Sequence, residues 1–185
     1  EGDYMNIFSV VFQDFQRICQ PLGANVAGSM EYDRERVHKA LIDAGFGDRL
    51  ASMEKGLDTM IYKNLTEDGV DVSGGEAQKI AIAKALYKDA PFIILDEPTA
   101  ALDPIAEAEI YSKFNDIAGD KTAIYISHRL SSCKFCDEIA VFHEGAVIQQ
   151  GTHAELVADG AGKYHQLWNA QAQYYTGKLE ETESP

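Results

Sequence analysis

The spacing of apolar residues predicts two amphipathic helices in the first half of the chain. One covers residues 33–44 and ends at Gly45, and the other covers residues 77–87. The apolar positions at helical spacing are Val37, Ala40, Leu41 and Ala44 in the first helix, and Ile80, Ile82, Ala83 and Leu86 in the second. Residues at this spacing share one side of a helix, so both segments can pack against a core.

Short runs of β-branched and aromatic residues predict the strands. They cover residues 7–12, Phe92–Asp96 and 122–127, and two further runs, 138–142 and 146–150, flank a His-Glu-Gly turn as in a hairpin. The run at 7–12 begins almost at the first residue, which we interpret as the sign of a piece of a longer chain.

The remaining pattern is helical, apart from the last ten residues. Asp103 followed by Pro104 has the residue order of a helix start. The apolar positions that follow it at helical spacing are Ile105, Ala108, Tyr111, Phe114 and Ile117. A short helix or turn is predicted at 130–134, further helices begin near His153 and Tyr164, and the polar, acidic residues 176–185 are predicted to be disordered. A helical part followed by alternating strands and helices indicates an α/β protein with two lobes.

Composition excludes some partners. The chain has 185 residues, 45% of them hydrophobic, which is enough for one globular domain with a buried core. Its net charge of −14 argues against binding to nucleic acid and against adhesion to anionic lipid, because both need a basic surface. No apolar run approaches the roughly 18 residues that cross a bilayer.

Three cysteines do not make a disulfide framework. Cys133 and Cys136 form a single C-x-x-C pair without a second ligand pair, so a zinc or redox site is the weaker alternative. We interpret these cysteines as reduced thiols of a cytosolic protein.

The sequence VSGGE at 72–76 lies at the start of the second predicted helix. Ser73 and Glu76 have the spacing of a capping box, which is a purely structural interpretation. The glycines between them allow a closer contact with a ligand. Backbone amides at a helix start carry partial positive charge, so a phosphate could bind against Ser73, Gly74 and Gly75.

The sequence FIILDE ends an apolar strand with two adjacent carboxylates. In α/β proteins ligands bind at the carboxyl ends of parallel strands, where Asp96 and Glu97 would lie. Asp96 could hold Mg²⁺, directly or through water, and Glu97 could orient and polarise an attacking water molecule. The alternative is a solvated acidic turn before Pro98.

Two polar residues follow other predicted strands. His128 comes after TAIYIS and could contact a terminal phosphate, although single histidines usually have structural roles. Gln13 ends the first strand in VVFQDF, where its amide could reach a metal ion or water.

Taken together, these motifs resemble the ATP-binding-cassette (ABC) ATPases, in the order expected for that family. VSGGE is similar to the family signature, usually written LSGGQ, and FIILDE to the Walker B strand with its catalytic glutamate. FQDF resembles the Q-loop, AALD the D-loop and ISHR the switch-histidine motif. The segments DEIAVFHEGAVIQQGTHAEL and GKYHQLWNAQAQYY extend the likeness to exporter-type cassettes, and the resemblance covers nearly all of the chain except its acidic tail.

The resemblance implies a P-loop NTPase-like α/β fold with a parallel-sheet core and a helical signature subdomain. It implies four segments: residues 1–14 with the core strand and Q-loop, 15–90 as the helical subdomain, 91–175 as the α/β core and 176–185 as the tail. It further implies that two such cassettes sandwich two ATP molecules head to tail, on the cytoplasmic face of a cell membrane and joined to transmembrane domains.

The same resemblance assigns roles to individual residues. Glu97 and His128 are the catalytic residues, acting on the water and on the γ-phosphate. Asp96 and Gln13 serve Mg²⁺, and Gln13 also links the site to the transmembrane partners. The residues implied in binding ATP are Gln13, Ser73, Gly74, Gly75, Glu76, Asp96 and Asp103, with Ser73, Gly74 and Gly75 serving the ATP of the opposite subunit and Asp103 communicating across the interface.

The sequence also departs from the family pattern. No G-x-x-x-x-G-K-[ST] loop occurs, so the lysine and backbone amides that hold the β- and γ-phosphates are absent. We therefore expect the chain alone to be inactive. Glu76 replaces the usual glutamine, and an added negative charge near a phosphate is unfavourable unless the carboxylate turns back toward the Ser73 amide.

Three functions remain open on the sequence. The chain fits the motor of an ABC exporter, a non-transport ABC ATPase, or a non-enzymatic cassette that only lends its signature to another one. The exporter-like tail favours the first. The transported substrate and the choice between identical and related partner cassettes do not follow from these motifs.

Overall fold

The computed structural model describes residues 6–12, 19–62, 69–100, 102, 107, 110 and 121–182, with the side chains of the last helix described as far as residue 172. The chain divides into two compact units, residues 1–126 and 127–185. Gln13 and Asp103 lie outside the described residues, as does most of the helix predicted after Asp103. Of that helix, positions 107 and 110 are described, and both are helical.

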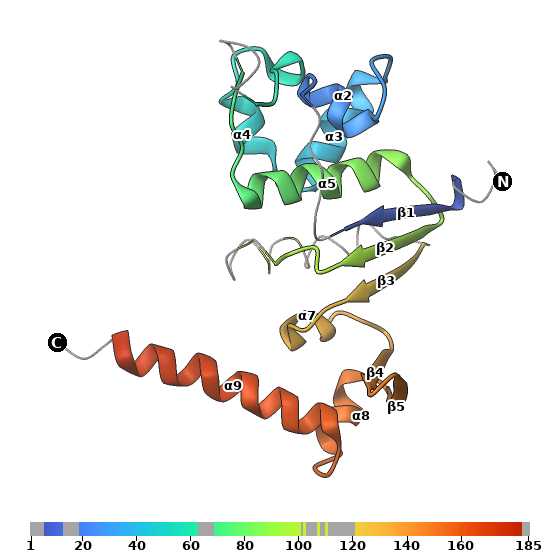
Figure 1. Ribbon diagram of the computed structural model, residues 1–185, viewed down its shortest axis with the longest axis vertical. Helices are drawn as coiled ribbons and strands as arrows, with labels where there is room; N and C mark the ends of the chain where they lie inside the picture. The colour runs from blue at the N-terminus through green and yellow to red at the C-terminus, as the bar shows by residue number, and fades with distance from the viewer. Residues whose placement is uncertain are drawn as a thin grey trace. The chain divides into compact units, whose positions relative to one another are not determined.

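A parallel sheet forms the core of the first unit (Figure 1). Its strands are β1 (Phe8–Val11), β2 (Phe92–Asp96) and β3 (Thr122–Ile126), with β2 in the centre. In the register, Ile94 lies beside Val10 on one side and beside Ile124 on the other. All three strands were predicted from their apolar runs, and their parallel pairing confirms the α/β fold class.

In the described ranges, several helical segments precede the central strand. They are α2 (Leu22–Ala27), α3 (Arg34–Asp43), α4 (Gly47–Ala51), the 3-10 helix η1 (Gly56–Asp58) and α5 (Gly74–Lys88). Helix α5 contacts β1 on one side and both α2 and α3 on the other, so it joins the sheet to the helical part of the unit (Figure 1). Ser9 of β1 is buried and its hydroxyl donates a hydrogen bond to the Ala85 carbonyl, 3.0 Å away.

The two helices predicted from periodicity are confirmed. Asp33 caps α3 by accepting a hydrogen bond from the Arg36 amide, and Gly45 follows the helix with a φ of +74°, which favours glycine. Helix α5 begins three residues earlier than its apolar pattern, because Ser73 caps it at the two glycines. The short helices α2, α4 and η1 were not predicted, since none is long enough to show a period.

Alternate strand residues fill the core between the sheet and α5. The largest fully buried side chains of this unit include Val11, Leu22, Leu41, Ile80, Ile93 and Leu95. The opposite side of the sheet is apolar and exposed. Val10, Phe92, Ile124 and Ile126 are 40%, 38%, 48% and 52% exposed, although parallel sheets are usually covered on both sides.

The second unit begins with α7 (Leu130–Cys133) and continues with the predicted antiparallel hairpin of β4 (Ile139–His143) and β5 (Ala146–Gly151). Its turn residues, Glu144 and Gly145, have φ values of +48° and +80°, as a type I′ turn requires. Helices α8 (His153–Ala158) and α9 (Lys163–Thr182) follow. The core of this unit contains Leu130, Ile139, Val141, Leu156 and Tyr164.

Helix α9 continues to Thr182, into the segment for which the sequence predicts disorder. Lysine, leucine and glutamate in this stretch are good helix formers, so they can extend a helix that begins on a packed core. None of the helices in the described ranges is both long enough and apolar enough to cross a membrane.

Candidate functional site

The start of α5 is fixed by two reciprocal hydrogen bonds. The Glu76 carboxylate accepts from the Ser73 amide at 2.8 Å, and the Ser73 hydroxyl accepts from the Glu76 amide at 3.2 Å. The predicted capping box is therefore confirmed. Ser73 and Gly74 are exposed, and the amides of Gly74 and Gly75 belong to the first turn, where backbone donors have no acceptor within the helix. An anion could approach them without displacing the cap.

Arg49 offsets the charge of Glu76. The Nε atom of Arg49, from α4, lies 3.0 Å from the second carboxylate oxygen of Glu76, in an ion pair without hydrogen-bond geometry. Both oxygens of Glu76 therefore have partners, and the bond to the Ser73 amide confirms that this carboxylate turns back toward it. The pairing of Arg49 with Glu76 was not predicted from the sequence. Helix α4 is too short to show apolar periodicity, and opposite charge alone does not identify a partner. A direct contact of Glu76 with a nucleotide stays a prediction.

The carboxylates predicted at the sheet edge emerge there. Asp96 is the last residue of β2 and lies beside Ile126 of β3, and Glu97 follows directly. Both side chains are half-buried. Glu97 has a φ of +47°, which is uncommon for a residue with a side chain and occurs preferentially at functional sites.

Three hydrogen bonds hold the backbone of Glu97. Its amide donates to the Ile126 carbonyl at 2.9 Å, and its carbonyl accepts from the Ala100 amide at 3.1 Å and from the Gln78 side chain at 3.0 Å. Gln78 comes from the second turn of α5 and is buried. This glutamine was not singled out in the sequence, although it lies two residues beyond the signature-like motif.

A buried polar contact stabilises the segment after the two carboxylates. The Thr99 hydroxyl donates to the Glu107 carboxylate at 3.1 Å, and only 2% and 6% of these residues are exposed. Thr99 lies in the turn that follows Pro98, and Glu107 lies in helical backbone. This contact ties the turn after Glu97 to the next helical segment, and no local pattern in the sequence predicts it.

His128 belongs to the second unit, whereas Asp96 and Glu97 belong to the first, so each is described with its own unit. The His128 side chain is exposed. Its backbone carbonyl accepts from the Gln171 side chain at 2.6 Å, and the same side chain accepts from the Leu130 amide at 3.0 Å. Gln171 of α9 therefore holds the backbone on either side of Arg129, at His128 and at Leu130. This role is visible only in the folded chain.

The two cysteines of the C-x-x-C pair are partly buried and pack against the core of the second unit. Burial raises the pKa of the Cys133 thiol, and it raises the pKa of Cys136 to about 11. Both thiols are therefore protonated at neutral pH, which makes them weak nucleophiles and poor metal ligands. No group of three or more His, Cys, Asp or Glu residues suited to a metal ion occurs in the described part of the chain. These observations favour the interpretation as reduced thiols.

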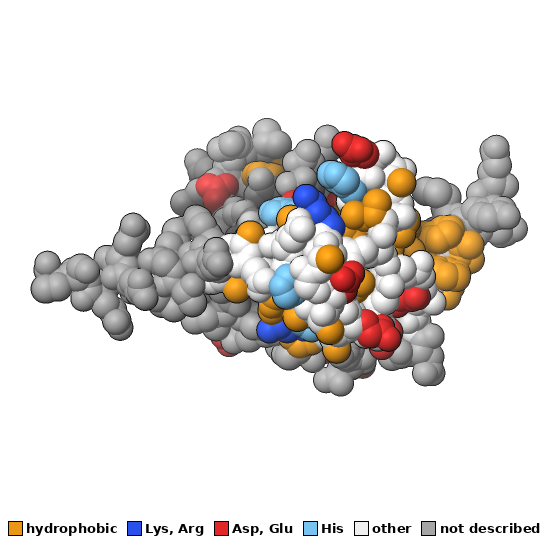
Figure 2. Space-filling model, turned by 90° about the horizontal axis from the view of Figure 1, so that it is seen from below, with side chains coloured by type: hydrophobic (Ala, Val, Ile, Leu, Met, Phe, Trp, Pro, Cys, Tyr) orange, Lys and Arg blue, Asp and Glu red, His pale blue; other side chains and the backbone are white. Residues whose placement is uncertain are grey.

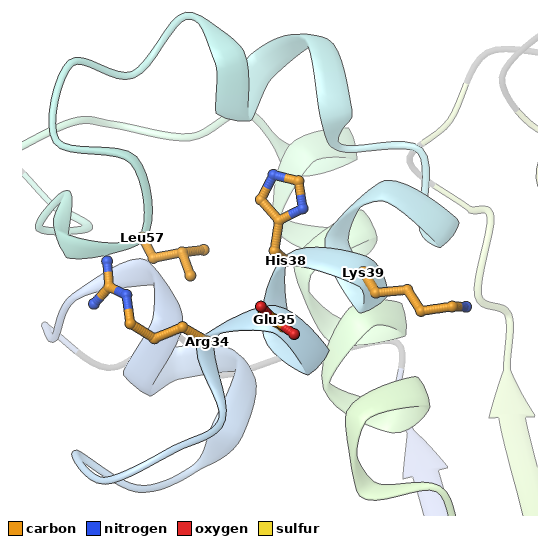
Figure 3. Close-up of a pocket in the computed structure, with 5 residues that line it drawn as sticks. All are labelled: Arg34, Glu35, His38, Lys39 and Leu57. Carbon is orange, nitrogen blue, oxygen red and sulfur yellow. The ribbon is translucent and has the colours of Figure 1, made fainter.

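An open depression of about 380 Å³ lies away from these motifs, between α3 and η1 (Figure 3). Its cationic side chains have partners outside it: Arg34 forms a bidentate pair with Asp58 at 2.9 Å, and Lys39 pairs with Asp43 at 2.6 Å. It contains none of the predicted site residues. On the side shown in Figure 2, acidic, basic and hydrophobic side chains are intermixed, unlike the continuous basic surface of a nucleic-acid reader.

These features fit a nucleotide-phosphate site: exposed amides at a helix start, and two carboxylates at the carboxyl edge of a parallel sheet. Comparison with known proteins agrees. Residues 4–100, more than half of the chain, match the family model described as ABC transporter. The chain belongs to the ABC transporter family.

Curated relatives refine this family assignment. The ATP-dependent lipid A-core flippases of Vibrio parahaemolyticus and Idiomarina loihiensis are 40% and 42% identical to this ABC sequence over 166 residues, or 89% of it. The flippase of Burkholderia pseudomallei is 37% identical over 175 residues. The chain spans about 28% of the length of these relatives.

A solved structure shares the fold. A bacterial Atm1-family ABC exporter with ATP bound superposes with a TM-score of 0.83 at 33% identity, covering 92% of this chain and 30% of the exporter chain. The chain is therefore a nucleotide-binding-domain sequence related to lipid A-core flippases and Atm1-type exporters. Its motifs had indicated a nucleotide-binding domain of the exporter type.

Proposed function

We propose that this chain supplies the signature, Walker B and switch-histidine part of the nucleotide-binding domain of an ABC exporter. In this role it couples ATP binding and hydrolysis to transport, at the cytoplasmic face of a cell membrane. The observation that carries the proposal is the pair Asp96 and Glu97, which emerges at the carboxyl edge of the parallel sheet with the Glu97 backbone held by three hydrogen bonds.

The proposed roles follow from position and chemistry. The Glu97 carboxylate accepts a proton from the attacking water, and Asp96 holds Mg²⁺, directly or through water. Bound ATP supplies the phosphoanhydride bond that is cleaved, and Mg²⁺ neutralises the negative charge of its phosphate oxygens. His128 contacts the terminal phosphate, and Gln13 contacts the metal site and links it to transmembrane domains.

The start of α5 serves a second cassette in this proposal. Ser73, Gly74 and Gly75 present a hydroxyl and backbone amides to the ATP bound by the opposite subunit, and Asp103 lies at the same interface. Both nucleotides are then sandwiched in a head-to-tail dimer. The lysine-bearing loop that surrounds the β- and γ-phosphates comes from sequence outside these 185 residues, so the chain alone is inactive. The proposed segments are residues 1–14, 15–90, 91–175 and 176–185.

The proposal is tested by Mg-ATP hydrolysis in the full-length transporter that contains this chain. Glu97→Gln removes the proton acceptor, so steady-state hydrolysis falls by roughly 10²–10⁴-fold while ATP still binds. Glu144→Gln is the matched control, because Glu144 also has a positive φ but lies in the exposed hairpin turn.

If Glu97→Gln leaves the rate of hydrolysis unchanged, Glu97 is not the catalytic residue. Steady hydrolysis of Mg-ATP by the purified 185-residue chain contradicts the proposed need for a loop from elsewhere.

A further inference from the structure

Gln78 connects two parts of the first unit that the proposed function assigns to different nucleotides. It lies two residues after the signature-like motif on α5, and only 8% of the residue is exposed. Its side-chain amide donates a hydrogen bond to the backbone carbonyl of Glu97 at 3.0 Å. One buried glutamine therefore joins the helix that begins at Ser73 to the residue that carries the proposed catalytic carboxylate.

The Glu97 backbone needs such support. A left-handed φ of +47° is unfavourable for a residue with a Cβ atom, and it persists only where the surrounding structure imposes it. The bond from the Glu97 amide to Ile126 fixes one end of the residue to β3, and the bond from Ala100 closes the turn behind it. Gln78 supplies the contact from the helical side of the unit.

Helix α5 is itself held at both ends, so it can act as a rigid connection. Near its start, Glu76 is bound by the Ser73 amide and by Arg49. Near its end, the Ala85 carbonyl accepts from the buried Ser9 hydroxyl of β1. A displacement of the first turn is therefore transmitted along the helix to Gln78 rather than absorbed by fraying.

We infer that Gln78 is a positioning residue for the hydrolysis of ATP. Its hydrogen bond fixes the backbone conformation of Glu97. Through α5, Gln78 also links the nucleotide bound at the start of this helix to the Glu97 carboxylate, which acts on the other nucleotide. This inference rests on the proposed function, because it uses the assignment of Ser73, Gly74 and Gly75 to the partner's ATP.

The test compares Gln78→Met with the unmodified full-length transporter. Methionine keeps the length and apolar volume of the side chain and removes the donor. We expect kcat to fall about tenfold, the effect of losing one net hydrogen bond, while KM for ATP changes by less than about twofold. Gln150→Met makes the same chemical change on the exposed hairpin, where Gln150 donates to Glu138 at 2.8 Å, and it leaves both constants unchanged.

Two further readouts separate positioning from simple packing. Amide hydrogen exchange in Gln78→Met becomes faster at Glu97 and Ala100 and stays unchanged in the interior of α5. When Glu97 is already replaced by glutamine, adding Gln78→Met lowers the residual hydrolysis by less than about twofold, because Gln78 acts only through that carboxylate.

Unchanged kcat in Gln78→Met overturns the inference. So does faster exchange along the whole of α5 together with a lower Tm, which indicates a packing defect. If the unmodified transporter hydrolyses no ATP, the proposed function fails. Amide hydrogen exchange at Glu97 and Ala100 then decides by itself whether Gln78 holds the Glu97 backbone.

Discussion

At the scale of single residues, Glu76 shows how a negative charge is accommodated beside a predicted phosphate site. One of its oxygens accepts from the Ser73 amide and the other pairs with Arg49. Both carboxylate oxygens are therefore occupied by these partners. The charge is therefore offset by a cation and by the helix start itself, where negative side chains are favourable.

Replacing Glu76 by glutamine in the full-length transporter tests this account. Glutamine keeps the length of the side chain and removes the charge, so we expect Mg-ATPase activity to stay intact or to rise. Arg49→Met, which leaves Glu76 without its cation, is expected to lower kcat/KM about two- to fivefold, the range of a partly exposed ion pair. The double variant should recover the Glu76→Gln activity. A large loss in Glu76→Gln alone contradicts the account.

Pairs of residues that are close in sequence were predicted, and pairs that are distant in sequence were not. Ser73 with Glu76, and Asp96 with Glu97, were predicted because each pair is close in sequence and carries its own local signal. Arg49, Gln78 and Gln171 were not predicted. Their partners are Glu76, Glu97 and the His128 segment, which lie far along the chain and meet them only after helices have packed.

At the scale of elements, helix starts have well-defined chemistry. Helix α8 begins with a second capping box, in which the Thr152 hydroxyl accepts from the Glu155 amide and the Glu155 carboxylate accepts from the Thr152 amide at 2.8 Å. The Glu155 carboxylate also accepts a hydrogen bond from the Thr152 hydroxyl at 2.8 Å, and the bonds from the Thr152 amide and hydroxyl lower the pKa of Glu155. Because the folded-state pKa is lowered, the stabilising contribution of Glu155 is present above its ordinary carboxyl pKa and is lost as the pH falls through the lowered value.

Thr152→Ala removes the side-chain half of this cap. We expect the free energy of unfolding to fall by about 1 kcal/mol, the usual cost of an N-cap substitution. Chemical denaturation followed by circular dichroism measures the change, and Thr152→Ser, which keeps the hydroxyl, should recover most of the loss. Equal stability of all three proteins at neutral pH shows that the cap contributes nothing.

Element bounds followed the sequence where the local signal was strong. The predicted strand Phe92–Asp96 agrees with β2 at both ends, and the helix predicted at 33–44 agrees with α3 and its caps. The extension of α9 into the acidic segment differs from the prediction, because composition alone does not show that a helix has a packed first turn to grow from.

At the scale of the whole molecule, the main feature is the apolar, exposed side of the parallel sheet. Val10, Phe92, Ile124 and Ile126 present an apolar surface on neighbouring strands. Exposed apolar patches and unpaired strand edges favour association. The alternating burial of strand residues shows that one side packs against the core while the other has no cover among the described residues.

We expect the purified 185-residue chain to self-associate as its concentration rises, with a mass above the monomer by light scattering. Replacing Val10 and Ile124 together by threonine keeps the β-branched shape and reduces the apolar area, so the monomer fraction should increase. Ile42→Thr, at an exposed position on α3, is the control and should not change the mass. A clean monomer of the unmodified chain at high concentration contradicts the expectation.

The sequence by itself determined the α/β class, the main strands and helices, the helix caps and the family to which the chain belongs. These features depend on residues close together in the chain, whose periodicity and hydrogen bonding act locally. Only the tertiary structure decided that Arg49 holds Glu76, that Gln78 holds the Glu97 backbone, and that one side of the sheet has no cover among the described residues. Such contacts depend on how separate elements pack, and packing brings together residues whose spacing along the chain carries no signal.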